Sequence, residues 1–184
     1  MNSKSLNMLC TLIMLCFCFA QCKKDKNTYD PEDQLPPATQ TGANTFGCIV
    51  NGKVYIPKGF SGTGTPNPKV TYDIGLNGRP YFGITADQII NSNFKGSILV
   101  SFRNLDHLGA FLIPDDFNFS AGWTDVIGSC TTTAFDTTIQ KSGGGIITKL
   151  DIPNHIISGT FSCKFKTLQC DTVFITDGRF DIKF

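Results

Sequence analysis

Two segments near the C-terminal end of the chain place apolar side chains at every second position. Residues 161–166 read FSCKFK and residues 173–176 read VFIT. Successive side chains of a β-strand point to opposite faces, so this alternation predicts strands with one buried face. The Asp177-Gly178 pair that follows favours the positive φ of a two-residue hairpin turn. The alternation and the turn together predict an antiparallel β-meander over residues 155–184.

The expected turn at Asp177-Gly178 also fixes a register for the meander. It places Ile175 opposite Phe180, and the preceding strand then places Phe161 beside Ile175. One face of the meander becomes wholly apolar in this register. The residues predicted to be buried on it are Phe161, Cys163, Phe165, Val173, Ile175, Phe180 and Ile182.

The chain from about Thr45 onward has the composition of an all-β domain. Val, Ile, Thr, Gly and the 16 Phe are abundant, whereas Ala, Leu and Glu are too scarce for long helices. Asn51-Gly52 and Asn77-Gly78 are further hairpin-turn signals, and residues 86–92 are the one segment expected to form a helical turn. The pattern predicts a single antiparallel β-sandwich or partly closed barrel. The other candidate strands are 46–50, 53–57, 70–76, 80–85, 97–103, 109–113, 131–135 and 146–150.

The N-terminal residues have the pattern of an export signal. Lys4 precedes an apolar run over residues 6–20, and this run is shorter than the roughly 20 residues that a helix needs to cross a bilayer. Residues 19–22 read FAQC, which resembles the Leu-Ala-Gly-Cys pattern of bacterial lipoprotein signals. We therefore expect Cys22 to carry a lipid anchor. Cleavage by ordinary signal peptidase after Ala20 is the alternative.

The residues after Cys22 are expected to form a flexible tether. Residues 23–44 are polar, contain prolines and lack periodic apolar positions. The predicted organisation is a signal peptide over residues 1–21, a lipid anchor and tether over 22–44, and an all-β domain over 45–184.

The charge of the mature chain excludes several kinds of partner. Removal of the signal takes away Lys4 and leaves 15 cationic and 15 anionic side chains. Nucleic-acid binding needs a clustered cationic face, and this neutral balance does not supply one. We expect the membrane to be contacted through the acyl chains on Cys22.

Four cysteines remain in the domain, and an exported domain can join them in two disulfides. In the predicted register Cys163 lies inward beside Val173, whereas Cys170 lies on the other face, so a bond between the two is disfavoured. Cys163 is expected to be a small buried residue, and Cys48 and Cys130 remain as partners for one another. The sequence contains no C-x-x-C, and neither of its two histidines has a cysteine within the usual ligand spacing, so no zinc site is expected.

The sequence contains few groups that could support catalysis. It has no nucleophile elbow, zinc-protease motif, P-loop or dinucleotide fingerprint. His107 and His155 follow turn-forming residues and are expected to be turn residues themselves. Asp115-Asp116 with Asn118 could offer oxygen ligands to calcium, but a solvated loop is favoured. We expect no enzymatic activity, no metal and no cofactor.

The aromatic side chains between residues 111 and 123 are the strongest candidates for binding. Phe117, Phe119 and Trp123 could form an exposed platform for a glycan, a peptide or a lipid. The alternative is that Phe117 and Phe119 belong to a half-buried strand and that Trp123 fills the core.

Several short segments resemble a family of small Bacteroidetes outer-membrane lipoproteins of unknown function. The resemblance covers the tether and the whole domain and is specific at its two ends. It implies an anchored β domain and brings with it no catalytic or binding residues. The segments that carry it are 35–42 (LPPATQTG), 45–48 (TFGC) with Asn51-Gly52, 147–151 (ITKLD), 157–161 (ISGTF) and 175–181 (ITDGRFD).

These observations predict an exported outer-membrane lipoprotein on the periplasmic face or the cell surface. The favoured function is a non-enzymatic binding module with a glycan, peptide or protein ligand. A carrier of small apolar ligands with a barrel interior is the alternative, and a hydrolase is a more distant one. An apolar cavity of several hundred Å³ would favour the carrier, and a filled core would favour the binding module.

Overall fold

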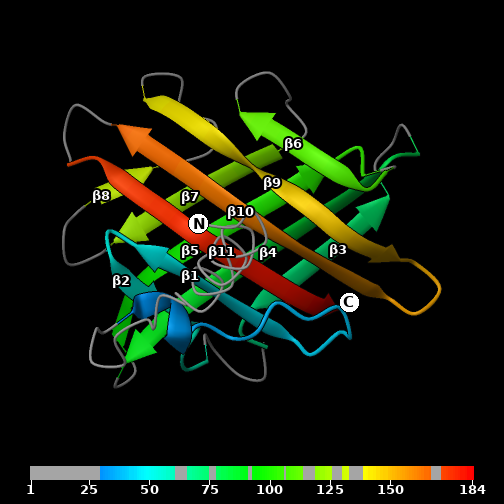
Figure 1. The fold of residues 1–184 in the computed structure, drawn as a ribbon, viewed down its shortest axis with the longest axis horizontal. Helices are drawn as coiled ribbons and strands as arrows, with labels where there is room; N and C mark the ends of the chain where they lie inside the picture. The colour runs from blue at the N-terminus through cyan, green and yellow to red at the C-terminus, as the bar shows by residue number, and fades with distance from the viewer. Residues whose placement is uncertain are drawn as a thin grey trace, which may run out of the picture. The chain divides into compact units, whose positions relative to one another are not determined.

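The computed structural model describes residues 30–60, 66–74, 78–90, 93–105, 107–113, 119–125, 130–132, 139–166 and 171–184. Residues Pro31–Phe184 form one compact unit. Two antiparallel sheets pack face to face in this unit (Figure 1). The all-β prediction is therefore confirmed, and the described strands form a sandwich rather than a closed barrel.

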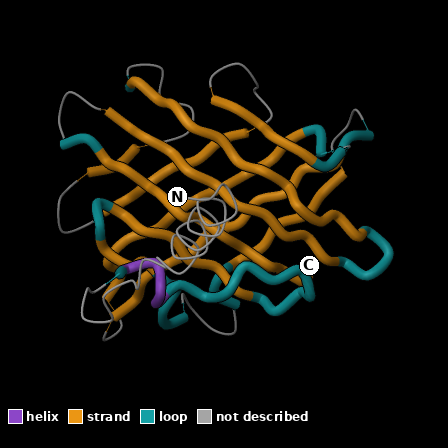
Figure 2. The backbone as a smooth tube through the Cα atoms, viewed as in Figure 1, coloured by secondary structure: helices purple, strands orange, loops and turns teal. Residues whose placement is uncertain are grey.

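The first sheet has six strands in the order β2-β1-β11-β10-β9-β6. The second sheet has five strands in the order β3-β4-β5-β7-β8. The single helical element of the described residues is the 3₁₀ turn η1, which is purple in Figure 2. The bounds are η1 Pro31–Gln34, β1 Thr45–Val50, β2 Lys53–Tyr55, β3 Lys69–Ile74, β4 Pro80–Ile90, β5 Asn93–Arg103, β6 Gly109–Ile113, β7 Phe119–Asp125, β8 Cys130–Thr132, β9 Gln140–Asp151, β10 Ile156–Lys166 and β11 Val173–Lys183.

Aromatic side chains fill the space between the two sheets. The ring of Phe102 in the second sheet lies 5.1 Å from that of Phe119, 5.5 Å from that of Phe111 and 5.9 Å from that of Phe180. Tilted and edge-on contacts at these distances add to the free energy gained by burying the rings. The buried Tyr55 hydroxyl also links the sheets, because it donates to the carbonyl oxygen of Ala86 at 2.8 Å.

The hairpin predicted at Asp177-Gly178 is wrong. The pair lies inside β11, which runs without a turn from Val173 to Lys183. Asp177 has the expected positive φ of 53°, but this conformation forms a β-bulge. The partner of Gly178 on β10 is Phe161, whereas that of Ile175 is Cys163, so one extra residue of β11 lies between two paired positions. A residue with positive φ, such as Asp177, is therefore compatible with a β-bulge as well as with a hairpin turn.

The bulge explains why the predicted buried face is nevertheless confirmed. The extra residue moves the alternation of β11 by one position, so Ile175 before it and Phe180 after it face the same side. Gly178 lies directly opposite Phe161 of β10, and an added Cβ on Gly178 would approach the Phe161 carbonyl oxygen to 2.6 Å. The residues of that face, all buried, are Phe161, Cys163, Phe165, Val173, Ile175, Phe180 and Ile182.

Two other local predictions had different outcomes. The turn at Asn51-Gly52 is confirmed, because both residues have positive φ and Val50 pairs with Lys53 across them. The helical turn over residues 86–92 is wrong, because β4 continues to Ile90 and pairs with β5. Ala86 is fully buried there, so packing between the sheets outweighs a weak helical preference. Asn77 and Ser92 lie outside the described residues.

Residues 31–44, which we expected in the flexible tether, are folded onto the first sheet. We call this segment the strap. Its Leu35 side chain is buried, and an added Cβ on Gly47 of β1 would approach Pro36 Cδ to 2.7 Å. The compact unit therefore begins at Pro31 rather than near Thr45.

Candidate functional site

The strap is held on the sheet by one buried carboxylate, that of Asp181 in β11. Its Oδ1 atom accepts hydrogen bonds from Gly42 N at 2.8 Å and from Ser158 Oγ at 2.8 Å. Its Oδ2 atom accepts from Thr39 Oγ1 at 2.6 Å and from Thr41 N at 2.9 Å. Thr41 Oγ1 and the Ala43 amide also donate to Oδ2, each at 3.2 Å. Six donors thus converge on one side chain.

The charge of Asp181 is favoured by these donors. Burial is the largest single influence on its pKa and opposes ionisation, but the hydrogen bonds from Thr39 and other strap residues and from Ser158 outweigh it. The pKa of Asp181 is consequently held well below the ordinary range of a carboxyl group. Five of the six hydrogen bonds to this carboxylate come from the strap and the sixth comes from Ser158. We therefore assign Asp181 a structural role.

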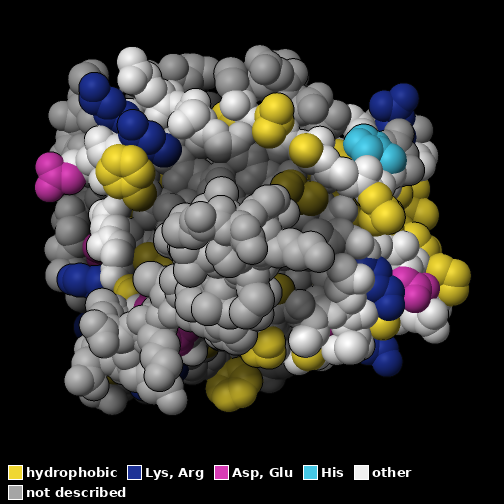
Figure 3. Space-filling view, viewed as in Figure 1, with side chains coloured by type: hydrophobic (Ala, Val, Ile, Leu, Met, Phe, Trp, Pro, Cys, Tyr) yellow, Lys and Arg dark blue, Asp and Glu magenta, His cyan; other side chains and the backbone are white. Residues whose placement is uncertain are grey.

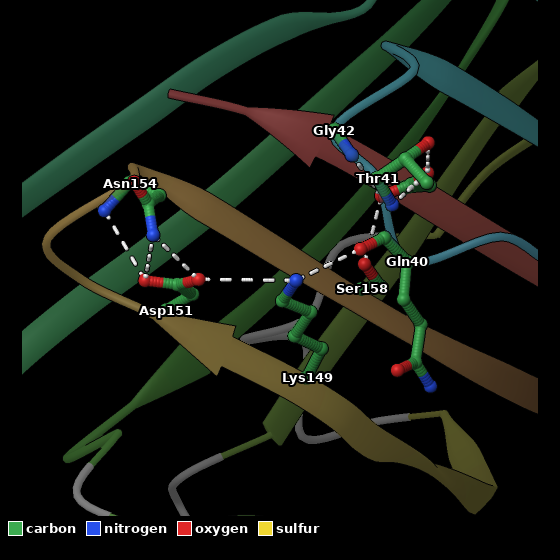
Figure 4. Close-up of polar contacts among 8 residues, drawn as sticks. Gln40, Thr41, Gly42, Lys149, Asp151, Asn154 and Ser158 are labelled. Atoms are coloured by element: carbon green, nitrogen blue, oxygen red, sulfur yellow. Dashed lines mark hydrogen bonds and ion pairs between the residues drawn. The ribbon is translucent and has the colours of Figure 1, made fainter.

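Further contacts hold the strap near each of its two ends. Arg179 forms an ion pair of 2.9 Å with Glu32 in η1, and the Asn44 side chain accepts a hydrogen bond from the Lys183 amide at 2.9 Å. Lys149 on β9 donates to the carbonyl oxygen of Gln40 at 3.0 Å (Figure 4). The strap therefore follows β11 from Arg179 to Lys183 and also contacts β1 and β9.

Asp151 and Asn154 stabilise the β9–β10 connection beside the strap. Both side-chain oxygens of Asp151 accept from Asn154 Nδ2, at 3.0 and 2.9 Å (Figure 4). The hydrogen bond from Asn154 is the main cause that lowers the pKa of Asp151, and the nearby Lys149 contributes. This arrangement is that of a turn stabilised by its own side chains.

One surface hollow lies between the strap and the outer face of the first sheet, and we call it the Arg179 cleft. Its volume is about 430 Å³. Its polar groups are the paired Glu32 and Arg179, the Asp177 carboxylate and two hydroxyls, while the exposed Ile146 supplies an apolar wall. The lining residues are Glu32, Ala38, Gly144, Ile146, Thr160, Phe161, Ser162, Asp177, Gly178 and Arg179.

A second hollow lies on another side of the strap, and we call it the proline groove. Its volume is about 300 Å³. Asn67 lines it but is already engaged, since its amide nitrogen donates to the carbonyl oxygen of Asp87 at 2.8 Å. The lining residues are Gln34, Leu35, Pro36, Asn44, Thr45, Phe46, Ile56, Pro57, Asn67 and Pro68.

Exposed apolar side chains do not gather into one patch on the described part of this face. Leu112, Ile146 and Phe174 are each about half exposed. Leu112 and Ile146 are diagonal neighbours on the paired strands β6 and β9, whereas Phe174 lies on β11, with β10 between it and β9. In the space-filling view the visible hydrophobic side chains lie in several separate places, some of them next to one another at the right-hand edge (Figure 3). The Lys164 ammonium lies 5.2 Å from the centre of the Phe174 ring. The two hollows are thus the more specific features of this face.

The residues that the sequence suggested for an aromatic platform are placed differently. Phe119 is only 4% exposed and belongs to the core, so it cannot contribute to an exposed platform. Trp123 is half-buried against the core, with its ring 5.4 Å from that of Tyr55. Phe119 therefore fits the alternative of a strand with a buried face, and Trp123 packs against the core as its alternative expected. Phe117 and the expected lipid site Cys22 lie outside the described residues.

The described cysteines are buried free thiols. Cys48 and Cys163 both lie in the core, so the pairing of Cys48 with Cys130 that the sequence left open is not formed. Burial raises the pKa of Cys163 to about 12 and raises that of Cys48 further. Thiols in this state react poorly. The Cys130 side chain and Cys170 lie outside the described residues.

The two histidines lie in different places on the surface of the described structure. His155 is exposed in the turn between β9 and β10, with φ of 56°, as predicted. His107 is exposed and stacks on Phe111 with 4.9 Å between ring centres. Asp106, which precedes His107, and the candidate calcium ligands Asp115, Asp116 and Asn118 lie outside the described residues. Among the described residues, no group of three or more His, Cys, Asp or Glu side chains could hold a metal ion.

The described part of the chain contains no helix that is long and apolar enough to cross a membrane. Comparisons of the chain with known protein families, with curated proteins and with solved structures find no match.

Sequence reasoning missed the role of Asp181. Alternation places it between Phe180 and Ile182, where it points away from the core, and an outward carboxylate is ordinarily solvated. The segment Thr39 to Gly42 (TQTG) carries hydroxyl and glycine donors, but no local pattern says which of the 15 acidic residues they meet. The hydrogen bond from Thr41 N spans 140 residues of sequence.

Proposed function

We propose that this protein is a non-enzymatic binding module that is exported and anchored to the outer membrane through a lipid on Cys22. In this proposal the side of the first sheet that carries the strap faces its partner. The N-terminal export pattern supports the location. The filled core between the sheets and the two hollows on the surface support the function.

The observation that carries the proposal is the filled interior of the sandwich. The rings of Phe102, Phe111 and Phe119 occupy the space that a carrier would reserve for its ligand. The two hollows described above lie instead on the surface beside the strap. A rigid β scaffold with surface hollows suits recognition of another molecule's surface better than enclosure of a small one.

The lining of the Arg179 cleft favours a peptide segment of a protein partner as its ligand. Ile146 offers an apolar contact, Thr160 and Ser162 offer hydroxyls, and the Glu32–Arg179 pair offers both charges. Among the described lining residues the only aromatic one, Phe161, is buried, so none of these residues offers a ring for stacking on a sugar. A peptide carries the apolar, polar and charged groups that match this set.

Site-specific photo-cross-linking in membranes tests the proposal. A photoreactive residue in place of Ser162, which is exposed in the cleft, is expected to capture a protein partner. The same photoreactive residue in place of Thr148, which is exposed on β9 outside the lining of the cleft, serves as the matched control. Capture at neither position, or equally at both, would contradict the assignment of the cleft. Saturable binding of a fluorescent fatty acid by the purified protein would favour the carrier instead.

A further inference from the structure

The strand β3 is a free edge of the second sheet as far as the described residues show. It pairs with β4 on one side, and no described strand pairs with it on the other. Its residues Lys69 to Ile74 (KVTYDI) contain neither glycine nor proline. An edge of this kind presents a row of backbone donors and acceptors that another strand can satisfy.

The two faces of β3 differ in character. Lys69, Thr71 and Asp73 are exposed and lie on one face. Val70 and Tyr72 lie on the other face and pack against the core, where the Tyr72 ring is 4.6 Å from that of Phe184. A strand added to this edge as a continuation of the sheet must keep polar side chains beside polar ones and apolar beside apolar.

The sequence of β3 is complementary to itself in one antiparallel register. When two copies meet with Thr71 opposite Thr71, Lys69 of each copy lies opposite Asp73 of the other. The same register places Val70 opposite Tyr72 twice. Opposite charges, β-branched–aromatic pairs and Thr–Thr pairs are all favourable when they lie directly across from one another.

Neighbouring registers that also keep the faces matched lose this complementarity. With Val70 on the symmetry axis, Lys69 lies opposite Thr71, and with Tyr72 on the axis, Asp73 lies opposite Thr71. Neither register pairs unlike charges. The register centred on Thr71 is therefore selected by charge as well as by shape.

We propose that two copies of this chain associate through β3, antiparallel and centred on Thr71, so that their second sheets join into one sheet across a twofold axis. The occupant of the edge is thus a second copy of the same chain. A twofold axis generates each favourable pair twice from one surface. Because six residues per copy bury a small area, we expect a weak dimer that confinement on a membrane would strengthen.

Disulfide cross-linking tests the register directly in the full chain purified in a mild detergent. Residues opposite one another in an antiparallel pair have Cα atoms about 4.5–5.5 Å apart, within disulfide range. Thr71→Cys is therefore expected to give a covalent dimer on mild oxidation. Lys69→Cys, on the same exposed edge, should give only the background of the unsubstituted chain, because its counterpart is residue 73. The double variant Lys69→Cys with Asp73→Cys should cross-link.

Charge reversal tests the association without cysteines. Lys69→Glu and Asp73→Lys should each raise the dissociation constant of the dimer about tenfold in sedimentation experiments. The reason is that each substitution converts two ion pairs into two like-charge pairs. The double reversal should restore it. A chain that stays monomeric across the concentration series overturns the proposal. Equal cross-linking by Thr71→Cys and Lys69→Cys, or insensitivity to the single reversals, does so too.

Discussion

Replacing Asp181 with Asn tests whether one carboxylate holds the strap on the sheet. Asparagine has the same shape, but it keeps one acceptor oxygen and presents an amide donor where the other stood. If the remaining oxygen takes the place of Oδ2, the new amide faces the Gly42 amide and the Ser158 hydroxyl. The hydroxyl can rotate to accept, whereas the Gly42 N–H is left opposed by another donor.

The expected cost follows from this geometry. The Gly42 N–H is partly buried, so leaving it without an acceptor costs about 1–3 kcal/mol at most, and the bonds that remain lose the extra strength of a charged acceptor, about 1 kcal/mol each at most. We expect Asp181→Asn to lower the free energy of unfolding by about 3–5 kcal/mol. Asp171→Asn, at an exposed acid outside this network, is the matched control and should leave stability unchanged.

Urea unfolding and amide hydrogen exchange provide the measurements. Exchange should accelerate most at the amides of Thr41, Gly42 and Ala43, which donate to Asp181. If only these amides are affected and global stability is retained, the strap detaches locally while the sandwich persists. A loss no larger than that of Asp171→Asn, with strap amides still protected, would refute the reasoning.

The same variant has a predictable pH dependence. Because folding lowers the pKa of Asp181, the unfolded chain takes up a proton first as the pH falls. The stabilisation by this group is complete above the ordinary carboxyl pKa of about 3.9 and is progressively lost below it. The stability difference between the native protein and Asp181→Asn should therefore be larger at neutral pH than at about pH 3. An undiminished gap in acid would mean that Asp181 is not the titrating group.

Three further predictions concern the core, the bulge and the anchor. Phe180→Ala should cost about 3–5 kcal/mol in urea unfolding, whereas Lys183→Ala on the outer face should cost under about 0.5; equal losses would contradict the assigned faces. Gly178→Ala should cost about 1–3 kcal/mol because its Cβ meets the backbone of β10. Gly52→Ala, which meets no atom within 4 Å, should cost less, because only the strain of its positive φ opposes it. Cys22→Ser should release the protein from membranes, or leave its precursor uncut, in a fractionation experiment, because a lipid anchor needs that thiol. If the mature unsubstituted protein were found in the soluble fraction, the anchor would be contradicted.

Periodicity in the sequence determined which residues of the C-terminal strands are buried. Alternation is a local property, because each strand residue turns its side chain by half a revolution from its neighbour. Phe161 and Ile175 could therefore be assigned to the core without knowledge of their partners. Phe180 joins them on the same face only because the alternation of β11 shifts by one position at the bulge, and all three are buried. The turn at Asn51-Gly52 was equally local and was also predicted correctly.

The sequence alone could not distinguish a turn from a bulge at Asp177-Gly178. Both need a residue with positive φ, and Asp177 satisfies either. The choice was made by the neighbouring strands, because β1 and β10 each pair with β11 on both sides of the bulge. A hairpin at this position would have removed those pairs. The same dependence on partners turned residues 86–90 into strand.

Only the tertiary structure decided where the folded unit begins and what Asp181 does. A polar segment rich in Thr and Pro is compatible with a free tether, and the strap differs from one only because β11 offers a buried carboxylate to its donors. The contacts between Thr39 and Asp181 join positions 142 residues apart. Such contacts follow from the order of strands in the sheet rather than from any local pattern, since the sheet brings the two ends of the unit side by side.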